Sequence, residues 1–114
     1  MVAVGIVTSV MWAQASPNDQ YVILIEWATM PSLEGTEVLI DGEPAGTLKR
    51  MGPRTQTGFK VGEGDHAVSF NHPEYPSEPT TVTTGFGGGR IMLMPELGNR
   101  RENGQDHYYL MFQR

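Results

Sequence analysis

Three histidines are the residues in this sequence best suited to metal binding or proton transfer: His66, His72 and His107. Two of them follow an aspartate, in the pairs Asp65-His66 and Asp106-His107. A metal site would need two or three imidazoles to converge with a carboxylate, because together they complete one coordination shell. The histidines instead occupy predicted turns and strand ends in separate parts of the chain. We therefore expect structural roles for them and no metal or cofactor.

The sequence also lacks the motifs of nucleophilic catalysis and phosphate binding. No serine lies in a G-x-S-x-G elbow, and the absence of cysteine excludes thiol catalysis, disulfides and Cys-ligated zinc. The run GFGGGR (85–90) is glycine-rich, but it lacks the Gly-Lys-Ser/Thr ending of a phosphate loop and lies between predicted strands. The sequence thus predicts a protein that is not an enzyme and has no catalytic residues.

Aromatic residues suggest one ligand-binding alternative. The faces of Trp27 and Tyr75 could stack on a sugar ring, although such residues more often pack in a core or an interface. A small-ligand or carbohydrate-binding module is therefore the alternative function, with these two residues as its stacking surface.

The elements that would position these residues are predicted to be short strands. The chain of 114 residues has the length of one domain, and its 14 Gly and 8 Pro interrupt it too often for long helices. About seven or eight strands with turns at close spacing predict an all-β fold, an antiparallel β-sandwich of immunoglobulin-like or transthyretin-like type. The strand-like runs are 21–27, 36–40, 44–50, 57–61, 66–72, 80–84, 90–94 and 107–112.

Local patterns define two of these features more closely. Asp41-Gly42 follows the run 36–40 and supplies the positive φ of a tight hairpin, so we interpret it as a structural turn. In 66–72, alternation predicts that Val68 and Phe70 point inward.

The first 16 residues, MVAVGIVTSVMWAQAS, form an uncharged apolar segment. Its A-x-A ending resembles a signal-peptidase site, although no Lys or Arg precedes the apolar run. As a helix it would span about 24 Å, short of the roughly 30 Å hydrocarbon core. The alternatives are the remnant of an export signal, an uncleaved anchor, a segment partly inserted or packed against other membrane helices, and a β-strand. We expect a membrane-associated protein of the cell envelope, exported to its extracytoplasmic, periplasmic side.

Charge also limits the partners. A net charge of −5 argues against nucleic-acid binding. The basic cluster Lys49, Arg50, Arg54 and Lys60 has no acid among it. It is either a solvated loop or a contact for an anionic partner or lipid headgroup.

Short motifs in the middle of the chain resemble the PEGA domain, a β-sandwich module of bacterial surface and envelope proteins. LEGTEVLIDGEPAG (33–46) resembles its start, GEGDHAVSF (62–70) its Gly-x-His-x-Val strand, and HPEYPSEPTTVTT (72–84) its tyrosine-containing loop and following strand. LKRMGPRTQTGF (48–59) departs from the family, which usually has a shorter connection there. The matching residues are Glu34, Gly35, Asp41, Gly42, Gly46, Gly64, His66, Val68 and Tyr75.

The resemblance covers residues 21–97 and implies a non-catalytic surface or interaction module, with no catalytic residue carried over. It divides the chain into the apolar N-terminal segment 1–20, the PEGA-like sandwich 21–97, and 98–114 as a polar linker plus an additional C-terminal strand.

Three predicted strands are apolar on both sides: YVILI (21–25), IMLM (91–94) and YYLMF (108–112). A strand of a free two-layer sandwich should have one polar side, so something must cover the second side. Either the protein's own loops do so, or partner proteins do. We expect a structural subunit that packs against other proteins of a bacterial membrane-associated assembly, with possible membrane contact through residues 1–16. The predicted contact residues are Met92, Met94, Tyr108, Tyr109 and Met111.

Overall fold

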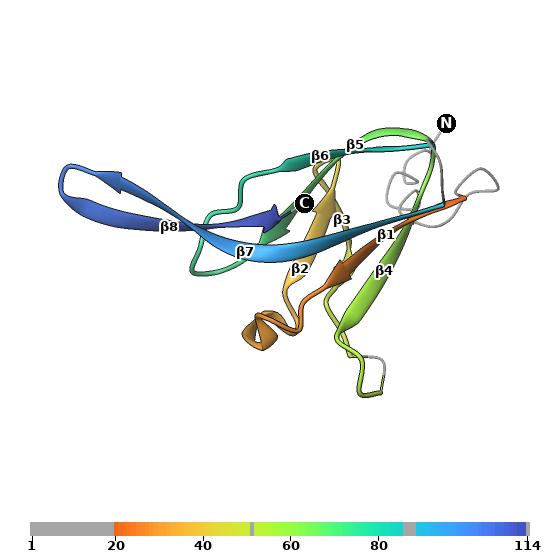
Figure 1. Ribbon diagram of the computed structural model, residues 1–114, viewed down its shortest axis with the longest axis horizontal. Helices are drawn as coiled ribbons and strands as arrows, with labels where there is room; N and C mark the ends of the chain where they lie inside the picture. The colour runs from red at the N-terminus through yellow and green to blue at the C-terminus, as the bar shows by residue number, and fades with distance from the viewer. Residues whose placement is uncertain (1–19, 51, 86–88, 114) are drawn as a thin grey trace, which may run out of the picture.

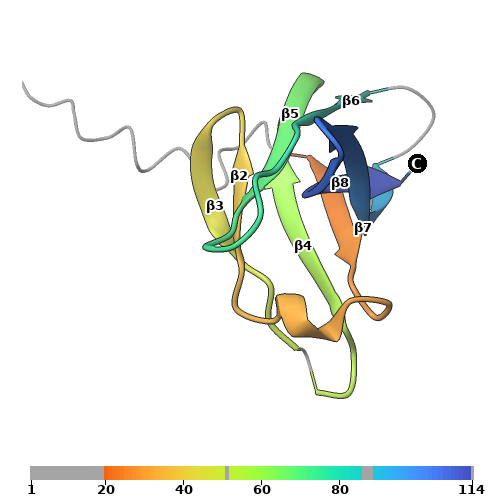
Figure 2. The ribbon, with the colours of Figure 1, turned by 90° about the vertical axis from the view of Figure 1, so that its left-hand side faces the viewer.

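The computed structural model describes residues 20–50, 52–85 and 89–113, which form eight β-strands and one turn of 3-10 helix. The elements are β1 (Tyr21–Glu26), η1 (Pro31–Leu33), β2 (Glu37–Ile40), β3 (Glu43–Thr47), β4 (Gln56–Val61), β5 (Gly64–Asn71), β6 (Thr80–Thr84), β7 (Arg90–Glu102) and β8 (Gln105–Gln113). The strands form two four-stranded sheets, which confirms the β-sandwich predicted from the sequence (Figure 1). Figure 2 shows β2 and β3 on one side of the molecule and β1 and β7 on the other.

The first sheet has the strand order β4-β1-β7-β8. β1 is antiparallel to β4 but parallel to β7, and β7 is antiparallel to β8. The long strand β7 has two partners, since residues 90–93 pair with β1 and residues 94–102 pair with β8. The parallel pair departs from the expected antiparallel pattern. It is possible because the strands of the second sheet lie between β1 and β7 in the chain and provide the long crossover that parallel strands need.

The second sheet has the order β3-β2-β5-β6 and is antiparallel throughout. The turn between β2 and β3 is Asp41-Gly42, with φ of 56° and 82°. Two consecutive positive φ values are typical of the type I′ turn, whose twist matches that of the strands it joins. The predicted structural turn is thus confirmed.

Residues 98–106 belong to a β-hairpin, so the predicted polar linker is wrong. β7 continues to Glu102, β8 begins at Gln105, and the two-residue turn Asn103-Gly104 has φ of 52° and 78°. Residues 99–107 are all exposed, and Figure 1 shows β7 and β8 extending together past the other strands. We call this projecting part the hairpin arm. Its polar sequence reflects water on both sides of a two-stranded ribbon and does not prevent strand pairing.

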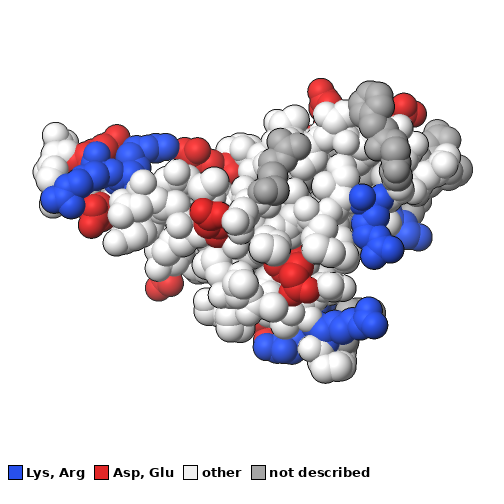
Figure 3. Space-filling model, viewed as in Figure 1, with Lys and Arg blue, Asp and Glu red and all other residues white. Residues whose placement is uncertain are grey.

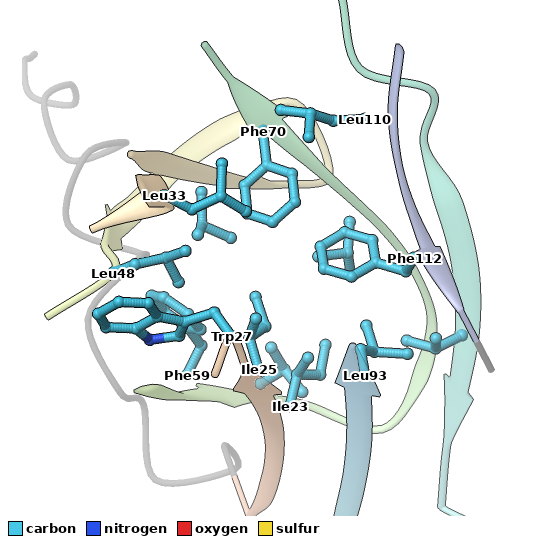
Figure 4. Packing of buried hydrophobic residues seen from close by; sticks show 14 residues of the cluster. Ile23, Ile25, Trp27, Leu33, Leu48, Phe59, Phe70, Leu93, Leu110 and Phe112 are labelled. Carbon is cyan, nitrogen blue, oxygen red and sulfur yellow. The ribbon is translucent and has the colours of Figure 1, made fainter. Parts of the chain in front are cut away.

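The core lies between the sheets and is built mainly from alternate residues of the strands, with Trp27, Leu33 and Leu48 added from the segments that connect them. Val68 and Phe70 point inward, as their alternation predicted. Phe70 of the second sheet meets Phe112 of the first, with ring centroids 4.7 Å apart (Figure 4). The buried hydrophobic residues are Ile23, Ile25, Trp27, Leu33, Val38, Leu48, Phe59, Val61, Val68, Phe70, Val82, Leu93, Leu110 and Phe112.

Candidate functional site

The side of the first sheet that faces away from the core carries a group of apolar side chains. Successive residues of a strand point to opposite sides, so the complete burial of Ile23 and Leu93 places their neighbours outside. Met92 is 51% exposed, and the other members of the group are partly buried. We call this surface the outer face, and it consists of Val22, Leu24, Met92, Met94, Tyr109 and Met111.

The strand register makes the outer face one surface. Leu24 of β1 lies beside Met92 of β7, and further along β7 Glu96 lies opposite Met111 of β8. The three strands that the sequence marks as apolar on both sides are therefore adjacent in one sheet. Val22 and Leu24 were missed as contact residues, although the unbroken apolar run of β1 carried the signal.

Two glycines leave room for side chains of the outer face to lie over the strand backbone. A Cβ on Gly58 would lie 3.2 Å from Val22 Cγ1 and 3.6 Å from Leu24 Cδ1, so these side chains lean over the glycine backbone. The ring of Tyr109 lies directly over Gly98, where a Cβ would overlap Cζ and lie 2.7 Å from Cε2. Any larger residue at position 98 would displace the ring.

Tyr108 does not belong to the outer face. It lies on the same side of β8 as the buried Leu110, but beyond the end of the core, where it is 45% exposed. Leu97 of β7 lies on that side too and is 39% exposed. The structure thus brings together four of the five predicted contact residues and places Tyr108 on the opposite side of β8 from Tyr109 and Met111.

Charged side chains border the outer face. Lys60 and Arg90 lie on either side of Val22 in the strand register, whereas Glu26 ends β1 and Glu96 lies further along β7. Lys60, Arg90 and Glu96 are exposed, and none of them takes part in an ion pair within the described ranges. An apolar centre with a charged rim is typical of protein–protein contacts.

Three hydrogen bonds hold the Glu26 carboxylate. Its Oε2 accepts from the Thr55 hydroxyl at 2.7 Å and from the Ala28 N–H at 2.9 Å, and its Oε1 accepts from the Gln56 amide at 2.9 Å. These donors, the Thr55 hydroxyl most strongly, lower the pKa of Glu26 below its ordinary value of 4.5 despite some desolvation. Glu26 is therefore a fixed negative charge at neutral pH.

Arg100 fixes Tyr109 and a neighbouring loop. Its Nη2 donates to Glu78 Oε2 at 2.7 Å, and its Cζ lies 5.2 Å from the centroid of the Tyr109 ring. The hydrogen bond and charge of Glu78 raise the pKa of Arg100 above its ordinary value. The backbone of the same loop pairs with β8, since Leu110 N–H donates to Pro76 O and Glu78 N–H donates to Leu110 O. The charge of Arg100 is thus already paired with a carboxylate of the same chain.

Trp27 is buried, so its predicted role in ligand stacking is wrong. It is 0% exposed, it donates a hydrogen bond to Thr57 Oγ1 at 3.2 Å, and Figure 4 shows its ring near Leu48 in the core. The inward alternation of β1 continues to this residue, which explains its burial. Tyr75 is half-buried against the core, and the centroid of its ring lies 5.3 Å from the centroid of the His72 ring. The carbohydrate alternative therefore loses one of its two stacking residues.

Asp41 and His66 have structural contacts. Asp41 Oδ1 accepts from the Ala67 N–H at 2.9 Å, and Asp41 Oδ2 lies 2.8 Å from His66 Nδ1. His66 Nε2 lies 2.8 Å from Gly62 O, so both ring nitrogens face oxygen atoms. These contacts tie the β2–β3 turn to β5. The other two histidines lie in the loop before β6 and in β8, and the described part of the chain contains no cluster of three or more His, Asp or Glu suited to a metal ion.

The residues of the basic cluster at positions 49–60 lie in different parts of the fold. Arg50 pairs with Glu34 at 3.2 Å and lies 5.5 Å from the centroid of the Trp27 ring, whereas Lys60 lies on β4 at the border of the outer face. On the side shown in Figure 3, basic side chains form separate groups with acidic ones between them.

Residues 1–16, where the membrane anchor or export signal was predicted, lie outside the described ranges. Within those ranges, no helix has the length and apolar character needed to cross a bilayer. Comparison with protein families, curated proteins and solved structures finds no match for this chain.

Proposed function

We propose that this protein is a non-catalytic β-sandwich subunit that packs against other protein through its outer face, within a bacterial membrane-associated or envelope assembly. The observation that carries the proposal is the outer face itself, with Met92 half exposed among apolar side chains from three adjacent strands. Apolar surface of this kind favours contact with a partner, because burial releases about 25 cal/mol per Å².

The envelope location rests on the resemblance to the PEGA domain and on the apolar segment 1–16. The residues that carry the resemblance most clearly are Asp41-Gly42 in the β2–β3 turn and Gly64, His66 and Val68 in β5. All of them belong to the second sheet, so a PEGA-like sandwich would leave the outer face of the first sheet free for a neighbour.

A photo-crosslinking amino acid in place of Met92 tests the proposal in intact cells. We expect an adduct heavier than the chain, whereas the same replacement at the exposed Glu43, in the second sheet, should give none. The absence of an adduct at Met92, or equal labelling at both positions, would contradict the assigned surface. Fractionation without detergent tests membrane association separately, since recovery of the full chain in the soluble fraction would contradict it.

A further inference from the structure

The outer face has a charge pattern that is complementary to itself. At the end where β1 begins, Lys60 and Arg90 lie on either side of Val22 and form a basic row. Towards the other end lie Glu26, the last residue of β1, and Glu96 on β7. Leu24, Met92 and Met94 lie between the two charged ends, whereas Met111 lies opposite Glu96.

We propose that the partner on the outer face is a second copy of this chain, related by a two-fold axis; this inference rests on the proposed function. The axis lies in the plane of contact and is perpendicular to the strands. The strands of the two facing sheets therefore run in opposite directions. The basic row of each copy then faces the acidic end of the other, and the apolar centres around Leu24 and Met92 meet at the axis. Contacts of this self-complementary kind produce the closed dimers that are the commonest symmetric oligomers.

The unpaired charges favour a second copy over an unrelated partner. Lys60, Arg90 and Glu96 form no ion pair within the described ranges, whereas Arg100 already pairs with Glu78. A partner surface of one sign would match only one end of the outer face and repel the other. A second copy matches both ends at once, because each contact is repeated by symmetry.

The dimensions of the sheet predict a weak dimer. Strands lie about 4.8 Å apart and residues about 3.4 Å apart along a strand, so four strands of about seven residues cover roughly 450 Å². Stable complexes bury about 800 Å² per partner, so this contact should be reversible and favoured at high local concentration.

Charge reversal in the purified full-length chain tests the inference, with the dimer dissociation constant measured by sedimentation equilibrium. Arg90→Glu and Glu96→Lys should each weaken the dimer about tenfold, because each reversal replaces two attractions by two repulsions. In the double variant the dissociation constant should return to within about threefold of the original value, because positions 90 and 96 exchange their charges and attract each other again. Lys49→Glu, an exposed change outside the face, serves as the matched control and should have no effect.

A chain that stays monomeric at about 1 mM, or a double variant that is not rescued, would overturn the second copy as partner. Crosslinking at Met92 separates this failure from that of the proposed function. An adduct of twice the chain mass supports the dimer. An adduct with a different protein overturns the dimer and leaves the proposed function standing, whereas a crosslink within one chain or no adduct overturns both.

Discussion

Met92 and Leu93 are neighbours on opposite sides of β7, and comparing them tests whether the outer face is open. Leu93 is 0% exposed, so Leu93→Ala leaves a cavity and should cost about 2–5 kcal/mol. Met92 is 51% exposed. Full burial of a methionine is worth about 1.5–3 kcal/mol, so truncating a side chain that is already half in water should cost below about 1 kcal/mol.

Thermal unfolding followed by circular dichroism measures the difference, at concentrations low enough to keep the chain monomeric. For a domain of this size each kcal/mol shifts Tm by about 4–8 °C, so Leu93→Ala should lower Tm by at least about 8 °C and Met92→Ala by no more than about half as much. Equal losses at the two positions would show that the protein's own chain covers Met92. The docking surface, and the dimer built on it, would then be refuted.

Glu26, Gly98 and Asp41 give three further predictions, each measured by urea unfolding. The fold lowers the pKa of Glu26. The contribution of the ionised Glu26 to the free energy of unfolding is therefore complete above the ordinary pKa of 4.5 and is lost as the pH falls through the lower pKa of the folded state. Glu26→Gln should therefore flatten the loss of stability in acid, and an unchanged acid slope would contradict the hydrogen bonds described. Gly98→Ala should cost about 1 kcal/mol by displacing the Tyr109 ring, and the cost should disappear in a Tyr109→Ala background; the same cost in both backgrounds would point to the backbone instead. Asp41→Ala should cost about 1–2 kcal/mol because it removes the acceptor that faces His66 and disfavours the positive φ, whereas Asp41→Asn should cost less than half as much; equal losses would contradict a role in turn geometry.

Features of the fold that depend on neighbouring residues could be predicted from the sequence. Alternation placed Val68 and Phe70 in the core. The dipeptide Asp41-Gly42 was enough to predict its hairpin turn, whatever strands pair in the rest of the sheet. The parallel pairing of β1 with β7 depends on contacts between distant parts of the chain, which no local pattern encodes. Residues 98–106 were mistaken for a linker because polarity was taken to mean loop, although Asn103-Gly104 is itself a strong hairpin signal.

Most of the residues of the candidate site were predicted from the sequence, but their arrangement on the sheet was not. Met92 and Met94 were identified because their strand is apolar on both sides, and the structure leaves both on the outer side. The opposite placement of Tyr108 depends on where the core ends along β8, which the sequence does not specify. The row formed by Lys60 and Arg90 depends on the register of three strands that are distant in sequence, so it becomes visible only in the assembled sheet.

The central position of β1 has a consequence for how the chain folds. One neighbour of β1 is β4, but the other, β7, comes near the end of the chain. While the chain emerges from the ribosome, the four strands of the second sheet are all made before β7, so that sheet can form first. Until residues 90–93 arrive, one edge of β1 presents unpaired backbone groups beside Val22 and Leu24, which is the kind of edge that chaperones protect and that aggregates when synthesis stalls.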